Sequence, residues 1–290
     1  MSPVLEAKDT FFYKKTTITC AGKLVSLSHP VVMGILNMTP DSFYEGSRIR
    51  GTEALLRQAE AMLQEGAAIL DIGGYSTRPG APEVTAEEEH IRVIPAIRAL
   101  RQAFPDCLIS VDTFRAVIAE EAVEAGANII NDVSGGTLDA AMFATAGRLQ
   151  VPYILMHMRG TPQTMPQFTQ YEDIMLELVQ FFEPRIVQLQ AAGVHDVILD
   201  PGFGFAKTID QNFEVLRHLG DLRLLGLPVL AGLSRKSMTY KTLEIPATEA
   251  LAGTIALNTI ALMHGASILR VHDVKEAVQT IKLFRKSITP

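Results

Sequence analysis

Residues 108–132 read LISVDTFRAVIAEEAVEAGANIIND. This stretch holds two short apolar segments, 108–111 and 128–130, separated by a segment with helical character. Short apolar segments without alternation are typical of parallel strands buried on both faces. The stretch therefore predicts a strand–helix–strand unit. A polar residue follows each strand, Asp112 after the first and Asn131 after the second.

The same unit recurs along the chain. Apolar segments predict eight strands, at residues 31–36, 69–72, 108–111, 128–130, 153–156, 196–199, 228–231 and 267–271. Helical patterns lie between them, and several end in a glycine where the backbone turns to positive φ: Gly66, Gly126, Gly193 and Gly265. Eight strands alternating with helices form either a closed barrel or an open doubly wound sheet.

Polar residues at the strand ends favour the barrel. An open sheet draws its site from two or three strands, whereas a barrel draws it from most of them. Here polar residues end or follow all eight predicted strands, and this repeated placement is the strongest evidence in the sequence: Asn37; Asp71, with Gly73 and Gly74; Asp112; Asn131 and Asp132; His157; Asp200; Ser234, Arg235 and Lys236; Arg270 and His272. We therefore predict a single (β/α)8 TIM-barrel domain over residues 1–290. Residues 11–28 predict a β-hairpin that covers the bottom of the barrel, opposite the site.

Bulk properties narrow the class of protein. The 290 residues are 48% hydrophobic, enough for one large core, and the net charge of −6 without a basic block disfavours nucleic-acid or membrane binding. Two cysteines make neither a disulfide framework nor a zinc site, which favours a reducing cytoplasm. The polar N-terminus lacks the pattern of a signal peptide, and no apolar stretch is long enough to span a bilayer.

Common catalytic motifs are absent. The loop PGFGFAKT (201–208) lacks glycines that a Walker loop needs, and GLSRK (232–236) is not a nucleophile elbow. No HExxH motif or Cys/His cluster predicts a zinc site. The glycines in these loops indicate only close backbone approach or positive φ.

Two sets of strand-end residues indicate chemistry. Asp112, Asn131 and Asp200 suit a heterocycle rich in N–H and C=N groups, since charged hydrogen bonds contribute ~1.5–3 kcal/mol each. The last two strands bring Arg235, Lys236, Arg270 and His272, which suit a phosphate. The alternatives are helix capping for the first set and ion pairs with surface carboxylates for the second. His157 suits either the site or the core.

At these residues the sequence resembles the dihydropteroate synthase family. The resemblance rests on MGILNMTPDSF (33–43), DIGGYSTRPGA (71–81), SVDTF (110–114), INDVSGG (130–136), LMHM (155–158), LDPGFGFAK (199–207), GLSRKS (232–237) and RVHDV (270–274). It implies a (β/α)8 barrel, usually in homodimers. It also implies the condensation of 6-hydroxymethyl-7,8-dihydropterin diphosphate with 4-aminobenzoate, giving 7,8-dihydropteroate and pyrophosphate.

The resemblance also implies roles for individual residues. Asp112, Asn131, Asp200 and Lys236 would hold the pterin ring, with Met156 beneath it. Asn37 would ligate Mg²⁺, and Arg270 and His272 would bind the diphosphate, with Arg78 nearby. Thr77 and Ser234 would lie by the aminobenzoate and diphosphate region. Phe205 and Pro79 would form apolar walls of the site. Asp41 and Phe43 would belong to a closing loop, where Asp41 would stabilise a pterin cation.

Some features leave alternatives open. Tyr75 stands where glutamate is frequent in the family, and Ala206 where glycine is frequent. A methyltetrahydrofolate-dependent methyltransferase would share the ring contacts but would not need Asn37 or a diphosphate site. A catalytically silent pterin-binding paralogue is the other alternative. Residues 250–264 predict a helix apolar on more than one face, which we expect to carry a dimer interface.

Overall fold

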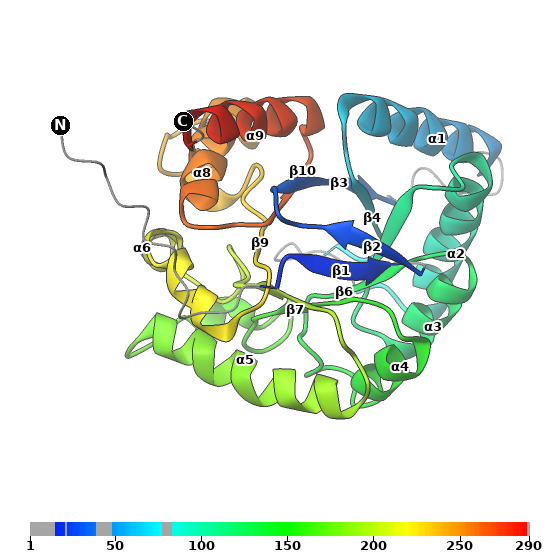
Figure 1. Ribbon diagram of the computed structural model, residues 1–290, viewed down its shortest axis with the longest axis horizontal. Helices are drawn as coiled ribbons and strands as arrows, with labels where there is room; N and C mark the ends of the chain where they lie inside the picture. Colours follow the sequence, from blue (N-terminus) through cyan, green and yellow to red (C-terminus); the bar gives the residue numbers. More distant parts are fainter. Residues whose placement is uncertain (1–14, 21, 39–47, 77–82, 289–290) are drawn as a thin grey trace.

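The computed structural model describes residues 15–20, 22–38, 48–76 and 83–288, and a ring of helices surrounds its parallel strands (Figure 1). The barrel strands are β3 (Val31–Asn37), β4 (Ile69–Gly73), β5 (Leu108–Asp112), β6 (Ile129–Asp132), β7 (Tyr153–Met156), β8 (Val197–Asp200), β9 (Leu230–Ala231) and β10 (Ile268–Val271). They pair in the order β8-β7-β6-β5-β4-β3-β10-β9. A parallel bridge from Leu199 to Val229 joins the two ends of this order. The predicted barrel is therefore confirmed.

The strand bounds agree closely with the sequence-based ones. The largest difference is at residues 228–231, where the ladder strand is only Leu230–Ala231. The two residues before it take part in the barrel through single contacts instead: Leu199 N donates to Pro228 O, and Ser267 N donates to Val229 O. This irregular seam is where the barrel closes.

Helices cover the outside of the strands (Figure 1). They are α1 (Arg48–Glu65), α2 (Ala86–Ala103), α3 (Ala116–Glu124), α4 (Met142–Leu149), α5 (Ile174–Ala191), α6 (Ile209–Arg217), α7 (Ser237–Tyr240), α8 (Leu251–Met263) and α9 (Val274–Ile288). Short 3-10 turns are η2 (Met165–Gln167), η3 (Leu219–Leu225) and η4 (Ala247–Glu249). The four predicted helix-end glycines all have positive φ, between +90° and +119°. No helix in the described ranges is long and apolar enough to cross a membrane.

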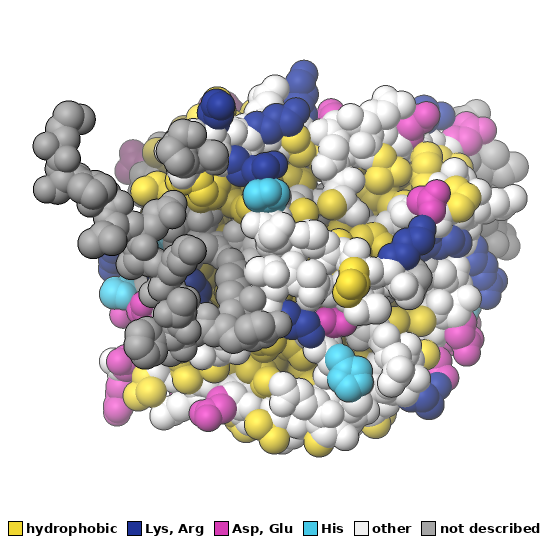
Figure 2. All heavy atoms as spheres, in the orientation of Figure 1, with side chains coloured by type: hydrophobic (Ala, Val, Ile, Leu, Met, Phe, Trp, Pro, Cys, Tyr) yellow, Lys and Arg dark blue, Asp and Glu magenta, His cyan; other side chains and the backbone are white. Residues whose placement is uncertain are grey.

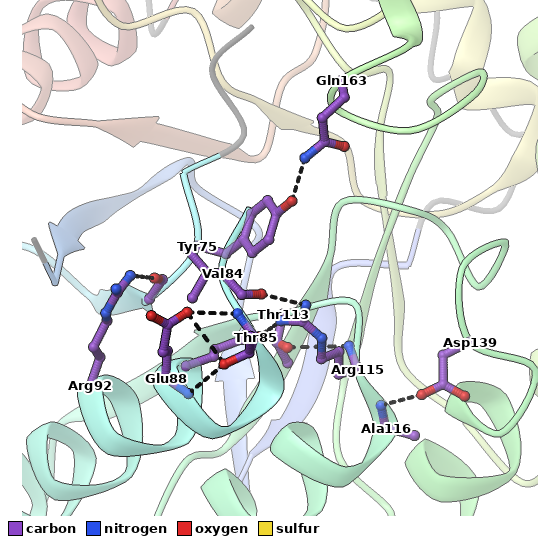
Figure 3. Close-up of polar contacts among 12 residues, drawn as sticks. Tyr75, Val84, Thr85, Glu88, Arg92, Thr113, Arg115, Ala116, Asp139 and Gln163 are labelled. Carbon is purple, nitrogen blue, oxygen red and sulfur yellow. Dashed lines mark hydrogen bonds and ion pairs between the residues drawn. The ribbon is translucent and has the colours of Figure 1, made fainter. Parts of the chain in front are cut away.

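The start of α2 shows how local sequence sets a helix boundary. Thr85 N donates to Glu88 Oε2 at 2.8 Å, and Glu88 N donates to Thr85 Oγ1 at 3.2 Å (Figure 3). This reciprocal capping box satisfies donors that the first helical turn leaves unpaired. The helix then runs past Pro95 to Ala103, packed on the strands that precede and follow it.

A hairpin closes one end of the barrel. Strands β1 (Thr17–Cys20) and β2 (Lys23–Ser26) pair antiparallel and lie across the middle of the ring in Figure 1. Their buried residues pack against the first residues of the barrel strands: Ile18, Cys20 and Leu27 against Met33, Ile69, Ile129, Ile154, Ile198, Leu230 and Ile268. The predicted hairpin and its position are confirmed for the described part; residues 11–14 lie outside it. Figure 2 shows the same face, with charged side chains scattered around the hairpin.

Candidate active site

The carboxyl ends of the strands lie at the other end of the barrel from the hairpin. Because all eight strands are parallel, the polar residues at their ends meet around one opening. The structure places there Asn37, Asp71, Asp112, Asn131, Met156 and Asp200, each within β3 to β8, with Ser234, Lys236, Arg270 and His272 from the last two strands and the turn after β9. Asp41, Phe43, Thr77, Arg78 and Pro79 lie outside the described residues.

Arg270 is the centre of the polar network. Its Nε donates to Asp71 Oδ2 and its Nη2 to Asp112 Oδ2, both at 2.6 Å. Asn131 Nδ2 donates to the same Asp71 oxygen at 3.1 Å. Four strands, β4, β5, β6 and β10, are therefore tied together at their carboxyl ends by one cation, two carboxylates and an amide.

Asp71 is a site residue to which the sequence analysis gave no role. It was visible as a polar strand end, but nothing in its local sequence distinguishes a carboxylate that holds an arginine from one that holds a ligand. Its side chain is fully buried, and its Oδ1 has no hydrogen-bond partner among the described residues. The signal that would have found it is the partner, Arg270, which is 199 residues away in sequence.

The network corrects the division of the site into an acidic ring pocket and a separate cationic clamp. Arg270 was expected to bind the diphosphate, yet two of its nitrogens donate to the carboxylates of Asp71 and Asp112. The two sets form one connected group because β10 pairs with β3, which in turn pairs with β4. The pocket therefore holds neighbouring opposite charges rather than two regions of single sign.

Burial shifts the protonation equilibria of this group. Burial and the nearby Asp71 charge raise the pKa of Asp112 to about 7, against the lowering effect of Arg270. The two carboxylates raise the pKa of Arg270 although burial opposes them. Burial likewise raises the pKa of Asp200, with Lys236 opposing it. Burial therefore weakens the preference of Asp112 for its charged form, and Arg270 supports that form.

Lys236 reaches the same pocket from the turn after β9. Its Nζ donates to Phe203 O and lies 4.8 Å from the centre of the Phe205 ring. Burial lowers the pKa of Lys236 to about 8, with Asp200 opposing that shift. The ammonium therefore binds the loop that follows β8 and interacts electrostatically with Asp200 at the end of this strand.

Ser234 and His272 form a second polar pair at the last two strands. Ser234 Oγ lies 3.0 Å from His272 Nδ1 and accepts from His272 N at 3.2 Å. The serine is buried and the histidine half-buried. The pair places a hydroxyl and an imidazole beside Arg270, a suitable set for an anion.

Arg235 differs from its prediction. Its sequence position predicted one of four groups that face an anion, with an ion pair to a surface carboxylate as the alternative. In the structure Arg235 Nη2 and Nε donate to Asp273 at 2.7 and 2.9 Å, and Nη1 donates to Thr248 O at 2.9 Å. Its backbone has φ +54°. The ion pair, which was the alternative interpretation, is therefore the correct one.

An apolar surface borders the polar group. Met156 is buried with Val133, Met158, Met165 and Ala206, and the half-buried rings of Phe114 and Phe205 pack against this cluster. These side chains come from the ends of several strands and from the loop after β8. A flat organic ring can therefore have polar groups at its edge and apolar atoms at its face.

Not every polar strand end faces the opening. Asp132 Oδ1 accepts from Ser134 N and Ser134 Oγ at 2.7 Å, and its Oδ2 accepts from Tyr153 OH at 2.5 Å. Adjacent residues of a strand point to opposite faces, so Asn131 faces the barrel interior while Asp132 holds the loop outside it. His157, for which the sequence left two interpretations, is fully buried.

Tyr75 joins two loops at the rim of the opening. It follows β4, and its hydroxyl accepts from Gln163 Nε2 at 2.5 Å in the loop after β7 (Figure 3). Arg115 lies under the Tyr75 and Phe114 rings, with its guanidinium carbon 5.4 and 4.7 Å from their centres. Arg115 in turn donates to the buried Glu89 and to Val84 O.

The donor set limits what kind of metal the site suits. Asn37 ends β3 with an exposed side chain, which offers one hard amide oxygen. No group of three or more His, Cys, Asp or Glu residues in the described ranges is arranged to hold a metal ion. A Mg²⁺ ion, which keeps several waters and takes substrate phosphate oxygens, fits one amide ligand better than a zinc ion does.

Comparisons with known proteins agree with this geometry. The family described as "Pterin binding enzyme" matches residues 33–272. The dihydropteroate synthase of Synechocystis sp. is 48% identical over 255 residues, which are 87% of this chain and 88% of the relative. A Yersinia pestis dihydropteroate synthase solved as a sulfonamide drug complex has a TM-score of 0.86 at 42% identity, covering 93% of this chain and 98% of that one. A Xanthomonas albilineans dihydropteroate synthase solved with 4-aminobenzoic acid has a TM-score of 0.87 at 39% identity, covering 96% and 100%.

Proposed function

The chain belongs to the pterin-binding enzyme family and to its dihydropteroate synthases, and on that premise we propose how its residues carry out the reaction. The enzyme condenses 6-hydroxymethyl-7,8-dihydropterin diphosphate with 4-aminobenzoate, giving 7,8-dihydropteroate and pyrophosphate in folate biosynthesis. The observation that carries the proposal is the network in which Arg270 binds both Asp71 and Asp112 at the barrel opening. It places acceptors for a ring beside a cation for a diphosphate.

The pterin ring would occupy the acidic part of the pocket. Its N–H donors match the oxygens of Asp112, Asn131 and Asp200, and its carbonyl oxygen matches the Lys236 ammonium. Met156, which is buried among other apolar residues, would lie against the ring face. A ring N–H that binds Asp112 would replace the donor that Arg270 now supplies to that carboxylate.

That replacement links ring binding to diphosphate binding. Arg270 would keep its Nε contact with Asp71 while Nη2 becomes available to phosphate oxygens. His272 and Ser234 lie beside it and would complete the anion site, with Arg78 from a segment outside the described residues. Arg235 would contribute only by holding the turn through Asp273.

We propose Mg²⁺ as the metal, with Asn37 as its protein ligand. Held by this amide oxygen, Mg²⁺ would neutralise diphosphate charge and so favour departure of the leaving group. The support is the chemistry of the donor set, a single exposed amide at the strand end next to β10.

The charged residues of the site would then favour departure of the diphosphate from the pterin. We propose that the C–O bond to the diphosphate breaks first, and that the aminobenzoate nitrogen attacks the resulting pterin cation and afterwards loses its proton. Arg270 and His272 would stabilise the leaving diphosphate electrostatically. Asp41 would stabilise the cation, and Thr77 and Phe205 would bound the aminobenzoate site. An aromatic amine needs no strong base, so the proposed reaction does not require the Ser234–His272 pair to act as nucleophile and base.

The reaction itself is the first test. Purified protein with both substrates should release pyrophosphate and form dihydropteroate, and a chelator should abolish this until Mg²⁺ is restored. A methyltransferase would instead transfer a methyl group from methyltetrahydrofolate, and a silent paralogue would bind pterin without pyrophosphate release. Either of those results would contradict the proposal.

The role of Asp112 is tested by Asp112→Asn. We expect the affinity for the pterin diphosphate to fall about tenfold or more, since a charged acceptor is replaced by a neutral one, while aminobenzoate binding changes little. Isothermal titration with each ligand measures the two affinities separately. Equal losses of affinity for both ligands would contradict the assignment of Asp112 to the pterin ring.

We propose further that the enzyme is a homodimer and works in the cytoplasm. Helix α8 contains no charged residue, and Ile260 and Met263 on it are exposed by 38% and 71%. An uncharged helix with an exposed apolar side suits an isologous contact. The two free, buried cysteines agree with a reducing compartment.

A further inference from the structure

Lys207 is a buried lysine that the proposed reaction does not use. It lies at the end of the loop of residues 201–208, which connects β8 to α6, and its side chain is 8% exposed. Its Nζ lies 2.9 Å from His157 Nδ1 and 3.2 Å from both Gly202 O and Phe205 O. An ammonium has three N–H donors. Each of the three Lys207 donors therefore has one acceptor.

The loop that Lys207 contacts has an irregular backbone. Gly202, Gly204 and Ala206 have φ of +70°, +80° and +49°, and a left-handed alanine is strained. Within the loop, Phe205 N donates to Gly202 O at 3.0 Å. Side chains from outside the loop or from its end supply further contacts to its carbonyl groups.

Those side chains bind four of its carbonyl groups. Lys207 takes Gly202 O and Phe205 O from the buried side, Lys236 donates to Phe203 O from the pocket side, and Tyr171 OH donates to Ala206 O at 2.8 Å. In addition, Gly204 N donates to Asn212 Oδ1 at 2.6 Å. Lys207 is the member of this set that binds the carbonyl of Phe205 itself.

His157 is the buried partner of the Lys207 ammonium. Its ring is fully buried and lies edge to face with Phe181, with a centroid distance of 4.8 Å. Burial and the positive charges of Lys207, Arg159 and Arg185 hold the pKa of His157 well below its ordinary value. A neutral imidazole can present its Nδ1 lone pair to the ammonium.

We propose that Lys207, with neutral His157 as its acceptor, is a positioning residue that holds Phe205 at the wall of the aminobenzoate site. This inference rests on the proposed function, because it assigns Phe205 to that site. The ammonium binds the Phe205 backbone on one side of the loop while the Lys236 ammonium lies 4.8 Å from the Phe205 ring on the other. Loss of the inner contact would free the ring to move and would weaken the binding of the second substrate.

The charge of Lys207 is sensitive to its surroundings. Burial lowers the pKa of Lys207 to about 7; Asp200 and Glu177 oppose this, while Lys236 and Arg159 add to it. Above that pH the neutral amine has two donors for three acceptors and no charge, so its hydrogen bonds to the loop carbonyls weaken. Aminobenzoate binding should therefore weaken as pH rises through the neutral range.

Lys207→Met tests the role, with Lys241→Met as the matched control at an exposed position. We expect the KM for 4-aminobenzoate to rise about tenfold or more in Lys207→Met, while the KM for the pterin diphosphate stays within about twofold and the control is unchanged. An unchanged KM for 4-aminobenzoate in Lys207→Met would overturn the proposal. If the wild type releases no pyrophosphate, the proposed function fails instead, so the two failures are distinguishable.

A second pair of variants applies if Lys207→Met does not fold. His157→Asn keeps an acceptor near the position of Nδ1, whereas His157→Phe keeps a ring without an acceptor. We expect His157→Phe to raise the KM for 4-aminobenzoate about fivefold or more and His157→Asn to stay near the wild type. Equal KM values in the two variants would count against the proposal.

The pH profile separates positioning from simple structural support. In the wild type the KM for 4-aminobenzoate should begin to rise near pH 7, and in Lys207→Met a rise should begin only above about pH 8, where Lys236 loses its proton. Asp112 also has its pKa near 7, but its titration should act on the pterin diphosphate. A wild-type KM for 4-aminobenzoate that is flat from pH 6 to pH 9 would overturn the role of the Lys207 charge.

Discussion

At the scale of single residues, the pocket is defined by charges whose protonation depends on each other. Arg270 keeps Asp71 and Asp112 close together, and burial raises the pKa of Asp112 to about 7. Lys236 has its pKa lowered to about 8 by burial, against Asp200. The interval between these two values is where Asp112 is an acceptor and Lys236 is still a donor, the combination that a pterin ring needs.

This arrangement predicts a pH profile with two limbs. The kcat/KM for the pterin diphosphate should rise as Asp112 loses its proton near pH 7, then fall as Lys236 loses its proton above about 8. Steady-state rates from pH 5 to pH 10 at saturating aminobenzoate measure it. Asp112→Asn should lack the acidic limb and keep the basic one; a variant that retained both would mean that another group titrates.

A buried ion pair outside the pocket yields a stability prediction. Arg115 is the partner of Glu89, whose side chain is fully buried (Figure 3 shows Arg115 with Val84 and Thr113). Arg115→Met should lower the free energy of unfolding by about 3–5 kcal/mol, because an unpaired buried carboxylate remains. Urea unfolding at pH 7 measures the loss.

The pH dependence of this variant has a definite sign. Burial raises the pKa of Glu89, with Thr113 and Arg115 opposing the shift. Without Arg115 the raised pKa should rise further, so protonation at lower pH should recover stability that is lost as pH rises. The variant Glu89→Gln is the control, because it carries no charge at this position. If Arg115→Met loses the same free energy of unfolding at pH 5 and at pH 8, the charge of Glu89 is not the cause.

At the scale of elements, close helix contact is set by small residues. Gly147 in α4 faces the end of α5, where a Cβ added at this position would lie 1.8 Å from Ala192 O. Gly147→Ala should therefore force the two helices apart and destabilise the fold by about 1–3 kcal/mol. Gly220→Ala is the control, since its Cβ would meet nothing nearer than 3.5 Å. Equal melting temperatures for the two variants would contradict the contact.

Loops also act as elements here, since side chains join them across the opening. Tyr75 after β4 contacts Gln163 after β7 and lies on the Arg115 guanidinium (Figure 3). The loop of residues 201–208 is joined by Lys207, Lys236 and Tyr171. The opening is therefore lined by loops that are held by side chains rather than by regular backbone pairing.

At the scale of the whole molecule, the open question is assembly. If α8 forms the proposed dimer contact, light scattering should give twice the chain mass at micromolar concentration. Ile260→Glu should give a monomer with unchanged helix content, because a charge cannot be buried unpaired in an apolar contact. Leu176→Glu on α5, also at an exposed apolar position, is the control. A wild-type monomer across this concentration range would remove the dimer proposal.

The sequence by itself determined the barrel, because the signals that specify it lie close together along the chain. Short apolar strands, amphipathic helices, helix-end glycines and polar residues after nearly every strand all lie within a few residues of one another, so they can be found without knowing what packs where. For the same reason the residues around the opening, such as Asp112, Asn131 and Asp200, could be chosen from the sequence. The substrates came from longer motifs, since a polar strand end by itself names no ligand.

Only the tertiary structure decided which charges meet. Asp71 and Arg270 are 199 residues apart, and Lys207 and His157 are 50 apart, so no spacing rule connects them. Arg235 lies next to Lys236 in sequence, yet it pairs with Asp273 instead of facing the pocket. Barrel closure brings distant strand ends within hydrogen-bond distance, and at such distances the direction of a side chain, rather than its charge, decides its partner.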